Sequence, residues 1–161
     1  MGRANVSLVN LGCRVNRAEL DAIGRELSRE GIRIVCRDEA EAIVVNTCAV
    51  TSEAQTKTRR ALRRAAEEPG VRAIVATGCA ASLFSAELEA LDPRIVVEPE
   101  RERVAQRVAH LLGLGHDGGG AEADQAFCGG AVTPTGRMRP GLKVQDGCDR
   151  RCSYCIVWKA R

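Results

Sequence analysis

The feature that most constrains the fold is an alternation of short apolar runs with amphipathic segments along most of the chain. Runs at residues 5–11, 42–46 and 72–77 are rich in Val, Ile and Ala, which is typical of strands buried on both faces of a parallel sheet. Shorter runs at residues 32–36 and 94–97 predict two further strands. The sequence therefore predicts an α/β fold, with a mostly parallel five-stranded sheet and helices on both faces.

The segments between these runs carry apolar residues at helical spacing, as in Leu20, Ile23 and Leu27. At the start of the first segment we expect Asn16 to be the N-cap and Glu19 to complete a capping box. These helices would supply the crossover connections that parallel strands require. The expected helices cover residues 16–30, 51–68, 82–91 and 100–112.

The composition changes after residue 112. Residues 113–141 contain GLGHDGGGAEAD and GGAVTPTG and show no apolar period, which predicts a flexible linker. Residues 142–146 predict a last short strand that leads into a cysteine loop. We therefore divide the chain into an N-terminal domain over residues 1–112, the linker, and the start of a second domain over residues 142–161.

Charge and composition exclude some classes of protein and leave others open. The formal net charge is +3, from 24 Lys and Arg against 21 Asp and Glu, a balance that neither requires nor excludes a nucleic-acid partner. The N-terminus lacks the pattern of a secretory signal, and no stretch approaches the roughly 18 apolar residues of a membrane span. We expect a cytosolic protein without membrane contact, in which the eight cysteines serve metal binding or catalysis rather than disulfides.

Three of these cysteines occupy equivalent places, one or two residues after a predicted buried strand. Cys13, Cys48 and Cys79 each precede a helix, and the ends of parallel strands meet at one edge of a sheet, so the three thiols should lie together there. Three thiolates suit a 4Fe–4S cluster with one open iron, or zinc with a fourth ligand from elsewhere, and the spacing does not decide between them. The alternative is that each is an ordinary small buried residue. Cys36 and Cys128 do not fit this pattern and are interpreted as isolated thiols.

A second set of three cysteines lies on one short loop, Cys148-x3-Cys152-x2-Cys155. Three thiolates on such a loop can bind three irons of a cubane cluster and leave the fourth iron for an external ligand. Zinc is the alternative, but a zinc site usually has paired cysteines and a fourth Cys or His. The two histidines, His110 in a predicted helix and His116 in the linker, are not obvious ligands.

Taken together, these motifs resemble a known family. The loop at residues 148–155 looks like the signature of radical S-adenosylmethionine enzymes. Three upstream motifs resemble the N-terminal domain of the methylthiotransferases: Leu11-Gly-Cys13-Arg-Val-Asn16, Val45-Asn-Thr-Cys48-Ala-Val-Thr51 and Thr77-Gly-Cys79. Within that family, the forms GC-x-V-N-x-x-E and NTC-x-V-T are most similar to the branch that acts on threonylcarbamoyladenosine in tRNA, because the isopentenyladenosine and ribosomal-protein branches usually differ there. Those two branches are the alternatives.

The resemblance implies two 4Fe–4S clusters and a tRNA substrate. The loop cysteines would hold the cluster at which an electron donor and S-adenosylmethionine generate a 5′-deoxyadenosyl radical. That radical would take a hydrogen from C2 of the modified adenine next to the anticodon. Cys13, Cys48 and Cys79 would hold an auxiliary cluster that supplies or carries sulfur, and a second S-adenosylmethionine would give the methyl group.

Two departures from the family pattern affect these expectations. Trp158 stands where the family commonly has a proline after the last cysteine, and the barrel strands that would bind S-adenosylmethionine do not follow within the sequence. We therefore expect an N-terminal fragment that is inactive alone, with residues 142–161 poorly ordered for lack of tertiary contacts. The rival hypothesis is a non-catalytic module of sulfur trafficking that binds an iron–sulfur cluster or zinc, or a half that associates with a barrel encoded elsewhere.

A basic segment at residues 57–64 allows a separate prediction about RNA. Its Lys and Arg side chains could meet the phosphates of tRNA. The plainer interpretation is a solvated helix face whose charge is offset by Glu67 and Glu68.

Overall fold

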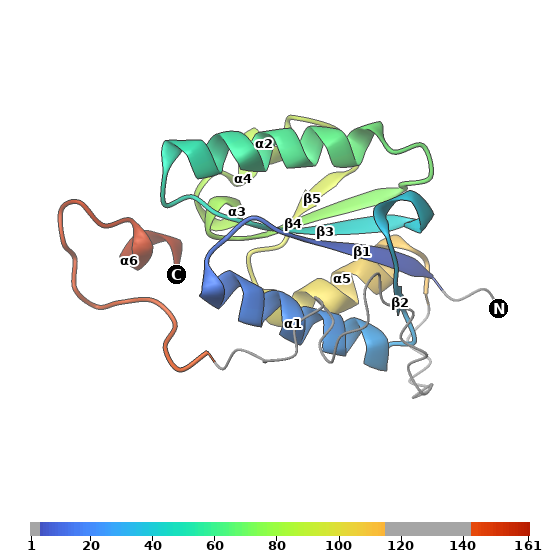
Figure 1. The fold of residues 1–161 in the computed structure, drawn as a ribbon, viewed down its shortest axis with the longest axis horizontal. Helices are drawn as coiled ribbons and strands as arrows, with labels where there is room; N and C mark the ends of the chain where they lie inside the picture. The colour runs from blue at the N-terminus through green and yellow to red at the C-terminus, as the bar shows by residue number, and fades with distance from the viewer. Residues whose placement is uncertain (1–3, 115–142) are drawn as a thin grey trace.

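The computed structural model describes residues 4–114 and 143–161, and the predicted linker lies almost entirely outside these residues. Five parallel strands form one sheet in the order β2-β1-β3-β4-β5 (Figure 1). The predicted five-stranded parallel sheet is confirmed. The strands are β1 (Asn5–Asn10), β2 (Arg33–Ile34), β3 (Ala42–Thr47), β4 (Ala73–Gly78) and β5 (Ile95–Val97).

Helices cover both faces of this sheet, as predicted. In Figure 1, α1 and α5 lie below the sheet and α2 lies above it. Within the described residues, no helix is long and apolar enough to cross a membrane. The helices are α1 (Arg14–Arg29), α2 (Ser52–Glu67), α3 (Cys79–Leu83), α4 (Ser85–Glu89), α5 (Val104–Leu111) and α6 (Val157–Ala160), with short 3-10 turns η1 (Arg37–Glu39) and η2 (Arg101–Arg103).

The two central strands explain why the sheet has a core on each face. Every residue of β3 and of β4 is buried, and their side chains alternate between two apolar clusters. Val44 packs with Leu27 of α1 and Val108 of α5, whereas Ile43 packs with Leu62 of α2. Full burial of one such side chain contributes about 1.5–3 kcal/mol. The apolar runs that predicted these strands are therefore buried on both faces.

The start of α1 differs from the prediction. The helix begins at Arg14, with Cys13 at its N-cap, and Asn16 and Glu19 lie buried inside it. The predicted capping box is therefore wrong. Both side chains make contacts with distant parts of the chain, and these tertiary contacts replace the local hydrogen bonds that a capping box would use.

Three other element boundaries also differ. β2 has only two residues, because the chain turns into η1 directly afterwards. The predicted helix over residues 82–91 is instead the pair α3 and α4, which meet at Phe84, whose φ of −132° is not helical. The described part of the predicted strand over residues 142–146 has no regular structure. It is held by side-chain ion pairs from Lys143 and Asp146 and has no place in the sheet ladder.

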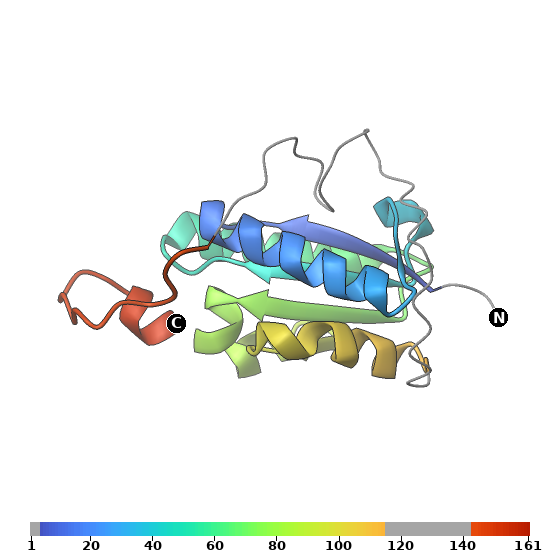
Figure 2. The same cartoon turned by 90° about the horizontal axis from the view of Figure 1, so that it is seen from below.

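Residues 143–161 cross the end of the sheet at which the strands finish (Figure 2). Ala160 of α6 is 5% exposed and belongs to the apolar cluster that contains Cys79 and Ala80 of α3. The expectation of a poorly ordered segment is therefore wrong for residues 143–161, because they have the tertiary contacts that a frayed chain end lacks.

Candidate metal centre

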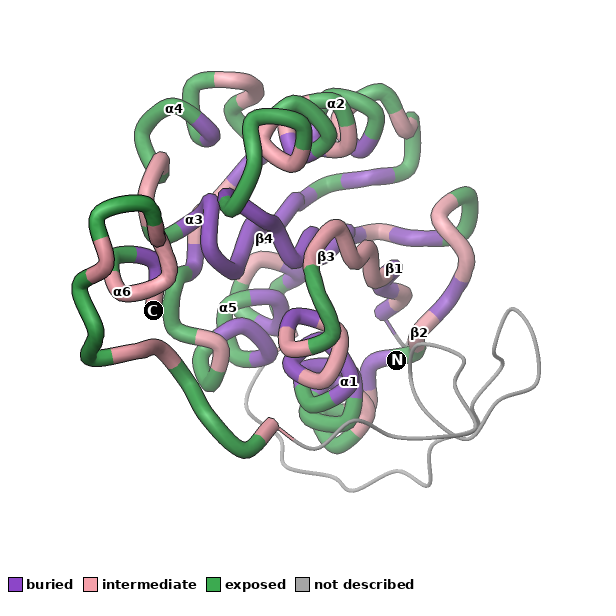
Figure 3. The backbone as a smooth tube through the Cα atoms, turned by 60° about the vertical axis from the view of Figure 1, so that its left-hand side comes forward, coloured by how far each residue is buried: buried purple, intermediate pink, exposed green. Residues whose placement is uncertain are grey.

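The carboxyl-terminal edge of the sheet carries the three cysteines that were predicted to form one site. Cys13 follows β1 after a short turn, while Cys48 and Cys79 come directly after β3 and β4. Because β1, β3 and β4 are neighbours in the sheet, the three turns lie side by side (Figure 3). The strand order reverses between β1 and β3, and open α/β sheets commonly bind their ligands at such a point.

A pair of buried asparagines joins the first two turns. Asn16 donates from Nδ2 to Oδ1 of Asn46 over 3.1 Å and to the carbonyl oxygen of Thr47 over 2.8 Å. In return, Nδ2 of Asn46 donates to the carbonyl oxygen of Asn16 over 2.7 Å. Neither side chain is exposed to solvent, and a buried amide left without its partner costs about 1–3 kcal/mol. The pair therefore holds the turn of Cys13 against the turn of Cys48.

Two threonine hydroxyls add to this network, and one of them reaches the third turn. The Thr47 hydroxyl donates to the carbonyl oxygen of Thr77 over 2.7 Å and accepts from the N–H of Ala81 over 3.1 Å. This joins the end of β3 to α3, on which the third cysteine lies. Thr58 of α2 donates to the carbonyl oxygen of Cys48 over 3.3 Å. Buried side-chain hydrogen bonds thus fix all three cysteine turns relative to one another.

Two glycines allow the turns to approach this closely. A Cβ atom at Gly12 would lie 2.2 Å from Cγ of Asn16, and one at Gly78 would lie 2.2 Å from Oδ1 of Asn46. Gly78 also has a φ of +90°, a conformation that residues with a side chain rarely adopt. The glycine before each of these two cysteines is therefore required by the asparagine pair.

The three thiols differ in their surroundings. Cys13 is exposed and its thiol donates to Oδ1 of Asn16 over 3.3 Å, whereas Cys48 and Cys79 are buried. Burial raises the pKa of the Cys79 thiol, and the nearby Cys48 adds to this rise. The positive charge of Arg161 acts in the opposite direction but does not cancel it. Among residues 4–114 and 143–161, no three His, Cys, Asp or Glu side chains converge as metal ligands would. The structure brings the turns together without pointing the three thiols at one centre.

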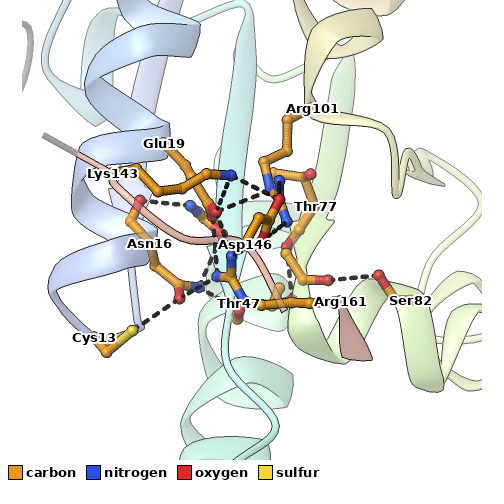
Figure 4. A network of polar contacts seen from close by, with 12 residues as sticks. Cys13, Asn16, Glu19, Thr47, Thr77, Ser82, Arg101, Lys143, Asp146 and Arg161 are labelled. Carbon is orange, nitrogen blue, oxygen red and sulfur yellow. Dashed lines mark hydrogen bonds and ion pairs between the residues drawn. The ribbon is translucent and has the colours of Figure 1, made fainter. Parts of the chain in front are cut away.

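Five charged side chains form a cluster beside Asn16, whose Oδ1 also accepts from the Cys13 thiol (Figure 4). The carboxylates of Glu19 and Asp146 each pair with the same three cations, Arg101, Lys143 and Arg161. Burial disfavours the charge of Arg161, but hydrogen bonds to the two carboxylates more than compensate and raise its pKa above the ordinary value. Partial burial also disfavours the charge of Asp146, but hydrogen bonds from the three cations hold its pKa well below the ordinary value. We call these five residues the charged cluster.

The donor set fits a centre with three thiolate ligands. Neighbouring strands of a sheet lie about 4.8 Å apart, so cysteines that follow three neighbouring strands are within reach of one small cluster. Thiolates are the usual protein ligands of iron–sulfur clusters, and a nearby cation such as Arg161 favours the charged form of a thiol. His110 lies at the end of α5, and His116 is outside the described residues. The residues of this edge therefore suit iron–sulfur chemistry better than a zinc site completed by histidine.

The second set of cysteines lies on an open loop. Cys148, Cys152 and Cys155 are half-buried, and a hydrogen bond of 3.1 Å from the N–H of Cys155 to the carbonyl oxygen of Cys152 closes one turn. Gly147, with a φ of +73°, brings the start of the loop close to Arg161, whose carbonyl oxygen would be 3.1 Å from a Cβ there. These thiols do not converge on one point either, within the described part of the chain.

Trp158 lies just after this loop, where the family pattern led us to expect proline. Its ring is approached by Arg151 and Lys159, whose charged groups lie 5.6 and 5.0 Å from the ring centroid. Such contacts contribute about 0.5–1 kcal/mol each at exposed sites, so they stabilise the turn into α6 only modestly.

Cys36 also departs from expectation. It lies at the N-cap of η1 and is disulfide-bonded, so the prediction that the cysteines form no disulfides is wrong at this position. That prediction assumed that the cytosol keeps thiols reduced. The assumption says nothing about whether a particular cysteine lies close enough to another to form a bond. Cys128 lies outside the described residues.

The basic face of α2 is partly neutralised by its neighbours. Lys57 pairs with Glu53 over 2.7 Å, and Arg59 pairs with Glu87 of α4 over 2.8 Å. This part of α2 is a solvated, partly neutralised face, but the partners are Glu53 and Glu87 and not the predicted Glu67 and Glu68. Glu68 instead lies 4.0 Å from Nε of Arg37. Three further arginines are exposed and form no ion pair with the described residues: Arg60, Arg63 and Arg64.

Sequence reasoning missed the charged cluster. Glu19 was assigned to a capping box, although it follows Asn16 by three residues on the face of α1 that also carries Leu20 and Ile23. Polar residues on an otherwise apolar stripe were the available signal, because a buried carboxylate requires cations close to it. The identity of those cations could not be found from local spacing, since Lys143 lies 124 residues further along the chain.

Comparison with known proteins places the chain in a family. Residues 5–98 match the model of the family described as "Uncharacterized protein family UPF0004". The chain belongs to this family. It is 32% identical to the threonylcarbamoyladenosine tRNA methylthiotransferase MtaB of Chlamydia pneumoniae, over 96% of this chain and 35% of that protein.

Other relatives extend this similarity to a second branch. The chain is 31% identical to the ribosomal protein uS12 methylthiotransferase RimO of Desulforudis audaxviator, over 98% of this chain and 37% of that protein. It is 30% identical to the MtaB protein of Bacillus subtilis, again over 98% of this chain and 37% of the relative. The predicted resemblance to methylthiotransferases is confirmed. The chain spans only about a third of the length of these relatives, which belong to both the tRNA and the ribosomal-protein branch.

Proposed function

We propose that this chain is the N-terminal part of a tRNA methylthiotransferase. The whole protein would place a methylthio group at C2 of N6-threonylcarbamoyladenosine, next to the anticodon, in the cytosol where tRNA is modified. The observation that carries the proposal is the set of three cysteine turns at one sheet edge, held together by the buried Asn16–Asn46 pair. The motifs around Cys13 and Cys48 favour the threonylcarbamoyladenosine branch, and relatives named MtaB support it.

Each residue set has its own role in this proposal. Cys13, Cys48 and Cys79 would hold one 4Fe–4S cluster, and the loop cysteines would hold a second that binds S-adenosylmethionine. When bound, these groups supply single-electron chemistry and sulfur. The chain itself positions the thiols through Asn16 and Asn46, buries two of the three, and brings the positive charge of the charged cluster beside them.

The exposed arginines of α2 are proposed to contact tRNA. Arg60, Arg63 and Arg64 have no ion-pair partner among the described residues and are free to meet phosphates. Replacing all three with Gln in the whole protein should weaken tRNA binding and reduce its salt dependence, while the iron content stays unchanged. Unaltered tRNA affinity would contradict this contact.

The proposed function is tested most directly in cells. Deleting the gene that encodes this chain should remove the methylthio form of N6-threonylcarbamoyladenosine from tRNA, as measured by mass spectrometry of nucleosides. The wild-type gene should restore it, whereas the Cys48→Ala gene should not. Intact methylthio-tRNA in the deletion strain would contradict the proposal.

The same experiment separates the second candidate, a ribosomal-protein methylthiotransferase, which the similarity to RimO proteins favours. In that case the deletion would remove a methylthio group from ribosomal protein uS12 and leave tRNA unchanged.

A further inference from the structure

The charged cluster joins two parts of the chain that are far apart in sequence. Glu19 and Arg101 belong to α1 and η2 of the sheet domain, whereas Lys143, Asp146 and Arg161 belong to the C-terminal segment. The contacts to Glu19 are close: Nε of Arg101 lies 3.1 Å from Oε1, Nζ of Lys143 lies 3.2 Å from Oε1, and Nη2 of Arg161 lies 3.2 Å from Oε2. Figure 4 shows all five side chains converging between α1 and the chain end.

Glu19 is the buried centre of this cluster. Its side chain is only 3% exposed, and it lies on the face of α1 that otherwise packs into the core. A buried carboxylate is stable only where cations and hydrogen-bond donors surround it. The sheet domain supplies one such cation, Arg101, and the other two arrive with residues 143–161. Docking of the C-terminal segment therefore completes the environment that Glu19 requires.

The docked segment links the two sets of cysteines. At one end, Nη2 of Arg161 donates over 3.1 Å to Oδ1 of Asn16, the same oxygen that accepts from the thiol of Cys13. At the other end, Asp146 lies two residues before Cys148, where the second loop begins. One ion-pair network thus contacts the first cysteine edge and anchors the start of the second loop.

We propose that Glu19 is a positioning residue, whose buried carboxylate holds residues 143–161 against the sheet edge. It thereby sets the distance between the turns of Cys13, Cys48 and Cys79 and the loop that begins at Cys148. The importance of that distance rests on the proposed function, in which sulfur and the methyl group must meet at one substrate. The docking itself does not depend on any bound cluster.

Amide hydrogen exchange of the 161-residue chain tests the docking, with Glu19→Gln as the main variant. Glu26→Gln is the matched control, because Glu26 lies on the same helix, is 52% exposed and, among the described residues, pairs only locally with Arg29. Amides of residues 143–161 should exchange at least about tenfold faster in Glu19→Gln, since two cations lose a buried partner. Amides of β3 and β4 should keep their protection, and Glu26→Gln should match the wild type. Equal protection of residues 143–161 in wild type and Glu19→Gln would overturn the proposal.

A second variant covers the case in which Glu19→Gln fails to fold. Asp146→Asn acts from the side of the segment, and the Asp146 side chain is 40% exposed, so the core of the sheet domain is not disturbed. It should accelerate exchange of the same amides, by about two- to fivefold, because a more exposed pair contributes less. Unchanged exchange in this variant would likewise count against the charged cluster as the anchor.

Cluster reconstitution separates this proposal from the proposed function. After anaerobic reconstitution, Glu19→Gln should bind as much iron as the wild type but show a changed magnetic coupling between the two reduced clusters. If Glu19→Gln binds as much iron as the wild type, and neither its magnetic coupling nor its amide exchange changes, the positioning role is contradicted. The proposed function would not be affected by that result. Absence of iron from the wild type would defeat the cluster assignment, while the exchange result would still decide the docking.

Discussion

The two sets of cysteines differ in how the fold holds them. Cys13, Cys48 and Cys79 come from turns far apart in sequence, and buried hydrogen bonds between neighbouring strands fix those turns. The loop at residues 148–155 is local in sequence, half-exposed, and contains one backbone hydrogen bond between its cysteines. The first site is therefore specified by the tertiary fold, whereas the second is specified by the short spacing of its own motif.

This difference determines what can damage each site. A change at the sheet edge disturbs the fold and the thiols together, because the asparagines and glycines that place the cysteines are also part of the core. A change in the loop should alter metal binding with little effect on stability, because few buried contacts depend on it. The predictions that follow test this contrast, beginning with the largest expected effect.

Gly78→Ala should be the most damaging single change at the sheet edge. A Cβ there would lie 2.2 Å from Oδ1 of Asn46, and the φ of +90° adds backbone strain. We expect a loss of about 3 kcal/mol or more in the free energy of unfolding, measured in urea. Gly31→Ala is the control, since Gly31 has a φ of +74° but no atom within 4 Å of a new Cβ, and it should cost only about 1 kcal/mol. Equal losses would mean that the close approach to Asn46 is unimportant.

Asn46→Ala should have the next largest effect. It leaves Nδ2 of Asn16 and the carbonyl of Asn16 short of partners in a site without solvent. The expected cost is about 2–3 kcal/mol, measured by urea unfolding. Asn5→Ala removes only a more exposed bond to the carbonyl of Glu39 and should cost less than about 1 kcal/mol. A small effect at Asn46 would contradict the claim that this pair joins the first two turns.

The C-terminal segment should unfold before the sheet. Trp158 is the only tryptophan, so its fluorescence reports on this segment, while far-ultraviolet circular dichroism reports on the sheet domain. The segment is held to the sheet domain mainly by the charged cluster and by the packing of Ala160. The unfolding midpoint measured by fluorescence should therefore lie at a lower urea concentration than the midpoint measured by circular dichroism. Added salt should lower the fluorescence midpoint further by screening the ion pairs. Coincident midpoints would show that the two regions form one cooperative unit.

In the sheet domain, a small acid dependence of stability should come from Asp92. Hydrogen bonds from the side chain and backbone of Arg94 lower the pKa of Asp92 in the folded state. This pair therefore stabilises the fold above the ordinary carboxyl pKa of about 3.9, and its contribution is lost as the pH falls through the lowered value. The stability difference between wild type and Asp92→Asn should be largest at neutral pH and should shrink in acid.

The sequence was sufficient for the sheet but not for the contacts that organise its edge. Fully apolar runs such as residues 42–46 predicted buried parallel strands, and the shared position of the cysteines after three strands predicted which turns would meet. The roles of Asn16 and Glu19 could not be predicted in this way. Both were read as local capping residues, because the partners that decide their roles, Asn46 and Arg161, lie far away in the chain.

Iron and sulfide counts after anaerobic reconstitution test the central claim most directly. The claim is that Cys13, Cys48 and Cys79 form one metal centre, separate from the loop at residues 148–155. Two 4Fe–4S clusters would give about eight irons in the wild type and about four after Cys48→Ala, with the same loss after alanine replacement of all three cysteines. Retention of all the iron in the triple variant, or zinc as the native metal without a brown chromophore, would contradict the account.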